Sequence, residues 1–89
     1  MRGFFVVFLI MFTVYAIKSQ VKNYIYVGMT GNLEERLFRH NAGFEKTTKP
    51  YLPFELIFQV EKPTRIEARA EEKRLKTSSG KSFLRSLIK

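Results

Sequence analysis

The stretch NYIYVGMTGNLEERLFRHNAG, from Asn23 to Gly43, contains the signals of a strand and of a helix in immediate succession. Its apolar, aromatic beginning, up to Met29, is typical of a buried strand. Asn32 is a good helix N-cap, with Glu35 at the capping-box spacing, and Gly43 supplies a left-handed stop. The stretch therefore predicts a strand that turns almost directly into a helix.

Two further strands and two further helices are predicted on either side of this stretch. The predicted strands run from Phe12 to Lys18 and from Phe54 to Glu61, and the predicted helices follow Thr64 (EARAEEKRLK) and cover residues 82–89 (SFLRSLIK). TSSGK, residues 77–81, is expected to separate these two helices. The strand from Phe12 to Lys18 and the strand from Asn23 to Met29 are close in sequence and are expected to form an antiparallel hairpin. The expected fold class is α+β: a small αβ sandwich in which helices flank a three-stranded antiparallel sheet, in the order β-β-α-β-α-α.

The composition narrows the class of partner. The chain has 89 residues, enough for one small domain, and 45% of them are hydrophobic, which is sufficient for a core. It contains no cysteine, which excludes disulfides and thiolate zinc sites. A net charge of +8 and a pI of about 10.1 favour polyanions, so nucleic acid and anionic membranes are the obvious partners.

Residues 1–10 form an apolar extension with three competing interpretations. The run from Phe4 to Phe12 resembles a targeting or anchoring segment, but Lys18 follows before the roughly 20 apolar residues of a membrane span are reached. Its β-branched and aromatic residues also suit a buried strand. A third hypothesis is that translation starts at Met11 and that the extension belongs to an over-long gene model. We expect one domain over residues 11–89 and no stable membrane partner.

Tyrosines and glycines on the predicted strands are the first candidates for chemistry. Tyr15 lies on the first strand, and Tyr24 and Tyr26 share one parity of the second, so the latter two hydroxyls leave the same sheet face. Core aromatics with a polar tip would show the same pattern. Gly28 and Gly31 bracket the turn into the helix, where glycine permits positive φ and close approach of the backbone to a ligand, although glycine also occurs in ordinary turns.

Arg36 and His40 lie one turn apart on the same face of the first predicted helix. An arginine fork suits phosphate oxygens, and a histidine can donate, accept or transfer a proton near neutral pH. The two residues therefore predict half of a phosphate site. The alternative is a solvated basic face that also includes Arg39.

On the helix predicted after Thr64, Ala68, Glu72 and Leu75 form a stripe that is expected to face the core. A buried carboxylate is costly unless it is paired or bound to a metal ion. The residue pattern leaves three alternatives open. Glu72 binds a ligand, it forms an ordinary salt bridge with Arg69 or Lys76, or its neighbour Glu71 is the functional carboxylate.

The ordered series TVY, YVG, NLEERLFRHNAG and EARAEEKRLK resembles the motifs of the GIY-YIG endonuclease superfamily, most closely its small single-domain bacterial branch. The resemblance covers essentially residues 11–89 and implies an αβ sandwich around a three-stranded antiparallel sheet. The first triplet is Thr-Val-Tyr in place of Gly-Ile-Tyr, which keeps the tyrosine. Carried over position by position, the resemblance implies as catalytic residues Tyr15, Tyr26, Arg36, His40 and Glu72, with Gly28 as the glycine of the second motif.

The resemblance further implies metal-assisted hydrolysis of a DNA phosphodiester. Glu72 would hold one Mg²⁺ or Mn²⁺, Arg36 would stabilise the charge of the transition state, and Tyr26 would be the general base. A phenol with its ordinary pKa of about 10 is mostly protonated at neutral pH. The base would therefore need nearby positive charge or a relay through His40 or Tyr15.

Three lysines, Lys46, Lys49 and Lys81, are expected to contact backbone phosphates and to give salt-sensitive, sequence-independent affinity for DNA. Cutting is then expected to be structure-selective or weakly specific. The expected role is DNA repair, and the expected location is the cytoplasm. Many active members of the superfamily carry an asparagine beyond the glutamate, whereas this neighbourhood reads GKSFLRS, with Lys81 as the polar substitute. The alternative function is therefore a catalytically weak or inactive nucleic-acid-binding module with the same fold.

Overall fold

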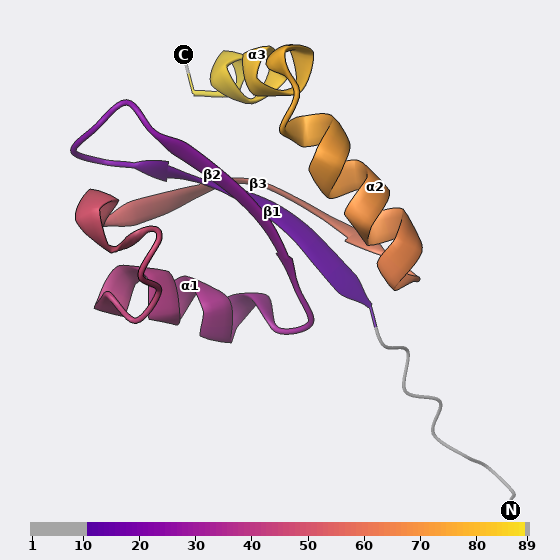
Figure 1. Cartoon of the computed structure of the whole chain (residues 1–89), viewed down its shortest axis with the longest axis horizontal. Coiled ribbons are helices and arrows are strands. Elements are labelled where there is room, and N and C mark those ends of the chain that lie inside the picture. Colours follow the sequence, from indigo (N-terminus) through magenta and orange to yellow (C-terminus); the bar gives the residue numbers. More distant parts are fainter. Residues whose placement is uncertain (1–10, 89) are drawn as a thin grey trace, which may run out of the picture.

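The structure, a computed structural model, describes residues 11–88 and confirms the predicted fold class and order of elements (Figure 1). The predictions of an anchor and of a later start site concern residues 1–10, which lie outside the described residues. A short 3₁₀ turn, η1, is the addition to the predicted order. The elements are β1 (Phe12–Ser19), β2 (Ile25–Thr30), α1 (Leu33–Ala42), η1 (Lys49–Tyr51), β3 (Phe54–Lys62), α2 (Arg65–Leu75) and α3 (Ser78–Ser86).

The central strand of the sheet is β1, because the spatial order is β2-β1-β3 and both pairings are antiparallel. Tyr15 on β1 is paired with Gly28 on one side and with Gln59 on the other. The pairing with β3 shifts register between Ala16 and Ile17. A strand with a partner on each side satisfies its backbone groups along its length, which suits the almost continuous burial of β1.

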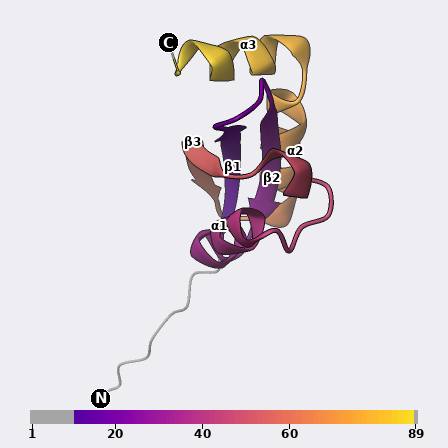
Figure 2. The ribbon, with the colours of Figure 1, turned by 90° about the vertical axis from the view of Figure 1, so that its left-hand side faces the viewer.

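Helices cover both faces of the sheet, with α1 on one face and α2 and α3 on the other (Figures 1 and 2). Val14 and Ala16 pack toward α2 and α3, in what we call the aliphatic face. Tyr15 and Ile17 pack toward α1, in what we call the tyrosine face. The alternation follows from the two-residue period of a strand, which sends successive side chains to opposite sides.

The predicted helix caps are confirmed. Asn32 Oδ1 accepts a hydrogen bond from the backbone N–H of Glu35 at 3.1 Å, and Gly43 ends α1 with a φ of 82°. Thr64 Oγ1 caps α2 in the same way, accepting from the backbone N–H of Glu67 at 3.1 Å. These polar side chains satisfy N–H groups that have no partner within the helix.

The predicted start of the last helix was wrong. The structure begins α3 at Ser78, because Thr77 Oγ1 accepts from the backbone N–H of Gly80 and caps the helix four residues earlier than expected. Gly80 does not break the helix. A Cβ at this position would lie 2.3 Å from the carbonyl oxygen of Arg74 and 2.6 Å from Leu75 Cα, so the glycine permits close packing of α3 on the end of α2.

Within residues 11–88, no helix has the length and apolar character needed to cross a membrane.

Candidate active site

A polar pocket of about 340 Å³ lies where the end of β2 meets α1 and α2. Four of the predicted site residues line it: Tyr26 and Gly28 from β2, Arg36 from α1 and Glu72 from α2. The remaining lining residues are Phe12, Met29, Thr30, Gly31, Arg65 and Arg69. The structure thus brings a phenol, a carboxylate and three guanidinium groups to one cavity from separate parts of the chain.

Tyr15 and His40 lie behind this pocket, in the core of the tyrosine face. Their side chains are fully or almost fully buried, and the Tyr15 hydroxyl lies 2.8 Å from His40 Nε2. His40 Nδ1 lies 2.8 Å from Thr48 Oγ1, which in turn lies 3.4 Å from the carbonyl oxygen of Glu45. The histidine is therefore part of a buried hydrogen-bond chain, and the alternative of a solvated face does not hold for it.

The direction of this chain follows from its last acceptor. A carbonyl oxygen only accepts, so the Thr48 hydroxyl donates to Glu45 and accepts from His40 Nδ1–H. His40 Nε2 is then unprotonated and accepts the hydroxyl proton of Tyr15. Burial lowers the pKa of His40, with the charges of Arg36 and Arg39 acting in the same direction against Glu45, and this keeps the ring neutral at pH 7.

Burial also raises the pKa of Tyr15 well above its ordinary value, and the neighbouring Tyr26 adds to this shift. Tyr15 therefore stays protonated and donates to His40 over the whole physiological range. Of the two motif tyrosines, Tyr26 lines the pocket and Tyr15 lies behind it, with 6.3 Å between the ring centroids. The ring of His40 lies 5.1 Å from that of Tyr26, so the buried chain supports the tyrosine at the pocket.

Gly28 provides space for these tyrosines. A Cβ at this position would lie 2.8 Å from the Tyr15 hydroxyl and 2.9 Å from Tyr26 Cε2. Positive φ, which the sequence led us to consider for Gly28 and Gly31, occurs among the glycines of residues 11–88 only at Gly43. The glycine at this point of β2 is thus explained by the rings that pack over it and not by a left-handed backbone.

Glu72 is buried, with a relative exposure of 7%, as the helical stripe predicted. Its Oε1 lies 3.0 Å from Arg69 Nη1 and its Oε2 lies 3.2 Å from Lys76 Nζ, so the salt bridge that the sequence left open as an alternative forms with both partners. Glu71 instead pairs with Arg74, which lowers the pKa of Glu71, and it is not part of the pocket lining. Position in the pocket therefore distinguishes the two neighbouring carboxylates.

The chemistry of the pocket fits a hydrated divalent cation better than a closed metal cage. Within residues 11–88, no group of three or more histidine or carboxylate side chains gathers into a cluster. Glu72 is the carboxylate among the lining residues, and Tyr26 and Thr30 add side-chain hydroxyl groups. Mg²⁺ commonly binds through one or two carboxylates, retains several waters and takes the remaining oxygens from a phosphate. This donor set suits that mode of binding.

Arg36 is the cation that reaches the pocket from α1. Its side chain is 36% exposed, and its Nε lies 3.9 Å from Glu45 Oε2, a loose pairing. Arg39 binds the same carboxylate at 2.7 Å and does not line the pocket. Arg36 is thus the α1 arginine that lines the pocket, where a ligand can contact it.

The three lysines predicted to bind DNA lie apart from the pocket lining. Lys46 and Lys49 are exposed in the segment between α1 and β3. Lys81 is partly buried on α3, and its Nζ donates to the carbonyl oxygen of Ile25 at 3.0 Å. Burial lowers the pKa of Lys81.

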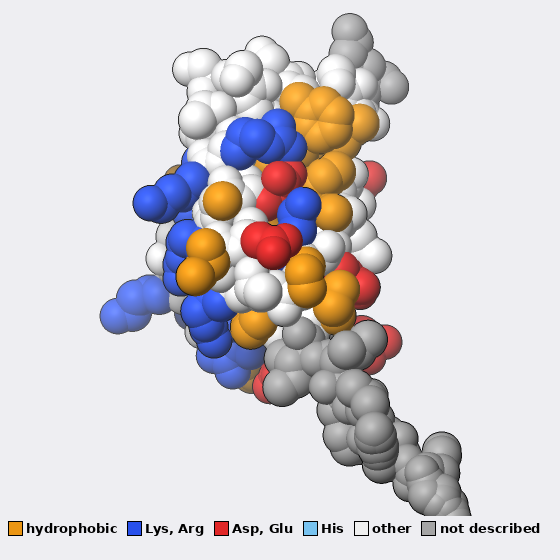
Figure 3. All heavy atoms as spheres, turned by 90° about the vertical axis from the view of Figure 1, so that its right-hand side faces the viewer, with side chains coloured by type: hydrophobic (Ala, Val, Ile, Leu, Met, Phe, Trp, Pro, Cys, Tyr) orange, Lys and Arg blue, Asp and Glu red, His pale blue; other side chains and the backbone are white. Residues whose placement is uncertain are grey.

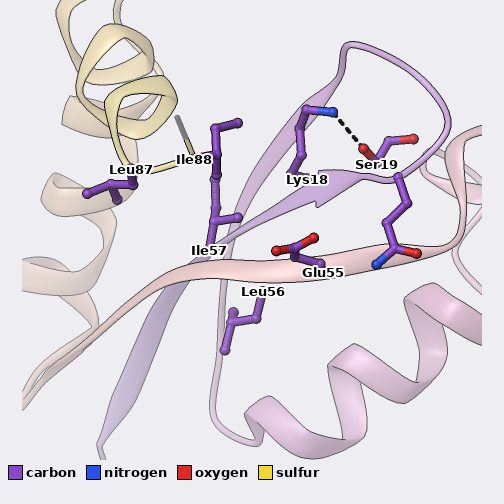
Figure 4. A pocket seen from close by; sticks show the side chains of 8 residues that line it. Lys18, Ser19, Glu55, Leu56, Ile57, Leu87 and Ile88 are labelled. Atoms are coloured by element: carbon purple, nitrogen blue, oxygen red, sulfur yellow. Dashed lines mark hydrogen bonds between the residues drawn. The ribbon is translucent and has the colours of Figure 1, made fainter.

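A larger hollow, of about 640 Å³, lies between the end of α3 and the sheet (Figure 4). Leu56, Ile57, Leu87 and Ile88 supply its apolar lining, and Lys18 contributes a cation whose Nζ donates to the carbonyl oxygen of Ser19. No predicted site residue lines it. The polar pocket that holds Tyr26, Arg36 and Glu72 is therefore the candidate active site, although it is smaller.

Sequence reasoning missed Thr48 and Arg65, and it considered Arg69 only as a partner of Glu72. No local signal marks Thr48, because its role depends on the fold bringing it to His40. The two arginines carry a signal in their spacing, since Arg65 and Arg69 are four residues apart and hence on one face of α2.

Comparisons with known proteins give a family match and a structural match. The family model described as the GIY-YIG catalytic domain matches residues 11–85. A UPF0213 protein from Bacillus halodurans, whose structure was determined by NMR in solution, is similar in fold, with a TM-score of 0.53 and 28% sequence identity over 86% of this chain and 84% of that chain. No curated protein matches the chain at a significant level. The match over most of the chain shows that it belongs to the GIY-YIG family and has the nuclease-type fold of that family.

Proposed function

We propose that this protein is an endonuclease that hydrolyses phosphodiester bonds of DNA in the pocket between β2, α1 and α2. The observation that carries the proposal is the convergence of Tyr26, Arg36 and Glu72 on one polar cavity, although three separate elements supply them. GIY-YIG nucleases generally use divalent metal ions, and the donor set of the pocket suits one Mg²⁺ or Mn²⁺.

Each residue has a role that follows from its place. Glu72 would hold the metal ion, which when bound supplies positive charge to the scissile phosphate and its leaving oxygen. Arg36 reaches the cavity from the side of α1 and would stabilise the extra negative charge of the transition state. Tyr26 is the motif tyrosine at the cavity, so in its phenolate form it would accept the proton of the attacking water.

Tyr15 and His40 act in this proposal as positioning residues. They are buried, joined by a hydrogen bond and in contact with the ring of Tyr26. Since the pKa of Tyr15 is raised and that of His40 is lowered, both stay neutral and keep the ring of Tyr26 in place without adding charge. A proton relay through Tyr15 is accordingly not part of the proposal.

The ion pairs of Glu72 set a condition on metal binding. Arg69 and Lys76 engage its two oxygens, so a metal ion must displace at least one of them or share the carboxylate. We expect Arg69→Gln to raise the affinity for Mn²⁺ severalfold, measured by titration calorimetry without DNA. Arg74→Gln, which frees Glu71 instead, is the matched control and should leave the affinity unchanged.

The central test is a nicking assay on supercoiled plasmid and branched DNA, with Mg²⁺ or Mn²⁺. Glu72→Gln should lower the rate by at least about 100-fold, and Arg36→Ala by a similar factor, since each removes charge stabilisation at the reacting phosphate. Glu71→Gln and Arg39→Ala are matched controls on the same helices and should stay within a few-fold of wild type. Equal losses for Glu71→Gln and Glu72→Gln would contradict the assignment.

The same assay tests substrate and alternative function. The pocket offers cations for phosphates, and such contacts carry little sequence information, so cutting should be structure-selective or weakly specific. Salt-sensitive DNA binding that is unaffected by Glu72→Gln, without nicking by the wild type, would favour the nucleic-acid-binding module instead.

A further inference from the structure

One face of α2 carries cations at regular spacing. Arg65, Arg69 and Lys73 follow one another at intervals of four residues, and all three are exposed. Residues four apart in a helix lie one above the other, with a rise of about 6 Å per step. They therefore form a row along the helix, which we call the α2 row.

The α2 row starts at the candidate active site. Arg65 and Arg69 line the pocket that holds Tyr26, Arg36 and Glu72. The same two arginines line a shallow hollow on the outer side of α2, together with Lys73, Ile66 and Ala70. The row is thus continuous from the pocket to the outer surface of the helix. Figure 3 shows the side of the molecule on which α2 lies, and basic side chains gather along the left of that view.

Two cations of the row have no carboxylate to neutralise them. Among residues 11–88, neither Arg65 nor Lys73 forms an ion pair within 4.0 Å, in contrast to Arg39, Arg74 and Lys76. The guanidinium of Arg65 lies 4.9 Å from the centroid of the Phe12 ring, which holds it beside the pocket. Positive charge that the fold leaves unpaired beside a candidate nuclease site is complementary to a polyanion.

We propose that the α2 row binds the phosphodiester backbone of DNA and leads a strand into the pocket. This inference rests on the proposed function and names the surface through which the substrate binds. It replaces Lys46, Lys49 and Lys81 as the main backbone contacts. Those lysines lie apart from the pocket lining, and Lys81 is hydrogen-bonded to the sheet, whereas Lys73 shares a hollow with the two arginines that line the pocket. Continuity with the pocket favours DNA over an anionic membrane, the surface that the exposed Ile66 would suit.

The test measures the affinity of the full 89-residue chain for a fluorescein-labelled DNA duplex in EDTA. Fluorescence anisotropy reports binding, and the titration is repeated over a range of KCl concentrations. Arg65→Gln/Lys73→Gln should weaken binding about 10- to 100-fold and reduce the slope of log K against log[salt] by about 2, since each phosphate contact contributes about 0.9. Lys46→Gln/Lys49→Gln removes the same charge and should change affinity by less than about threefold. Arg65→Lys/Lys73→Arg should keep the wild-type slope.

Each other outcome is decisive. Equal losses for the two glutamine pairs would show diffuse attraction and overturn the α2 row, while nicking by the wild type would leave the proposed function intact. Absence of both salt-sensitive binding and nicking by the wild type would overturn the proposed function as well. Binding to phosphatidylglycerol vesicles that is lost in Arg65→Gln/Lys73→Gln, with DNA binding unchanged, would assign the row to a lipid surface. Circular dichroism and urea titration of each variant exclude loss of fold as the cause.

Discussion

The two faces of β1 bury side chains of opposite chemistry, although they belong to one strand. On the aliphatic face, Val14 and Ala16 join a core that includes Leu75 and Leu84. On the tyrosine face, the buried Tyr15 donates to a neutral histidine in a directed hydrogen-bond chain. On the first face the β1 side chains pack against other apolar side chains, whereas on the second Tyr15 also supports the ring of Tyr26, which lines the pocket. Substitutions of the buried aliphatic side chains should therefore change stability, and substitutions beside the tyrosines should change stability and cleavage together.

The largest expected effect is on the aliphatic face. Leu75→Ala removes a fully buried side chain and should lower the free energy of unfolding by about 2–5 kcal/mol, because the cavity adds to the lost transfer free energy. Urea denaturation measures this loss. The nicking rate per folded molecule should be unchanged, and a tenfold fall in that rate would contradict the division between the faces.

Gly28→Ala should have the next largest effect, on the tyrosine face. Its Cβ would press on the Tyr15 hydroxyl and on the ring of Tyr26, so we expect a loss of about 1–3 kcal/mol in the free energy of unfolding. The nicking rate of the folded protein should fall as well, because Tyr26 is displaced. Gly31→Ala is the control, since nothing lies within 4 Å of its added Cβ. A stable Gly28→Ala variant with full activity would show that the rings move aside without consequence.

Thr48→Val tests the hydrogen-bond chain with little change in shape. It leaves His40 Nδ1–H buried without an acceptor, which should lower the free energy of unfolding by about 1–2 kcal/mol, within the range for an unsatisfied buried donor. The adjacent and exposed Thr47 offers the matched control Thr47→Val, for which no loss is expected. Equal midpoints for the two variants in urea would show that the chain contributes nothing to stability.

The smallest expected effect is the pH dependence from His40. Burial lowers its pKa below the value of 6.5 of the unfolded chain, so below pH 6.5 the unfolded state binds a proton that the folded state excludes. The free energy of unfolding should fall as the pH drops from about 7 toward the folded pKa, by at most about 1.4 kcal/mol per pH unit. Urea midpoints measured at each pH should lose this slope in His40→Gln.

A separate fall at lower pH belongs to carboxylates. The pKa values of Glu45 and Glu71 are lowered from 4.5 mainly by hydrogen bonds from Arg39 and Arg74, so their contribution is lost only as the pH falls below that range. In His40→Gln, the fall in the free energy of unfolding at this lower pH should remain. A slope between pH 7 and 5 that persists in His40→Gln would assign it to other groups.

Much of the fold was predictable because its signals are local. The cap at Asn32 and the left-handed Gly43 each depend on a few neighbouring residues. The start of α3 was missed for the opposite reason. Gly80 has the local signature of a break, yet it is required by the backbone of Arg74 and Leu75 against which it packs.

In the candidate site, too, the features set by local spacing were predictable and those set by long-range contacts were not. Spacing alone placed Glu72 on a buried stripe and Arg36 one turn from His40, because helical periodicity depends only on sequence separation. Whether those residues meet, and what surrounds them, depends on contacts between distant segments. Thr48 reaches His40 only because the segment after α1 folds back, and the Gly28 position is explained only by its pairing with Tyr15.

By itself, the sequence determined the order of the elements, the helix caps at Asn32 and Thr64, the basic charge and the family motifs. These properties follow from short-range periodicity and composition. The tertiary structure decided which tyrosine reaches the pocket, that His40 is buried and neutral, and that Arg65 and Arg69 line the pocket and continue into the α2 row. Burial, desolvation and long-range pairing exist only once distant segments pack together, and they set the protonation and the exposure on which chemistry depends.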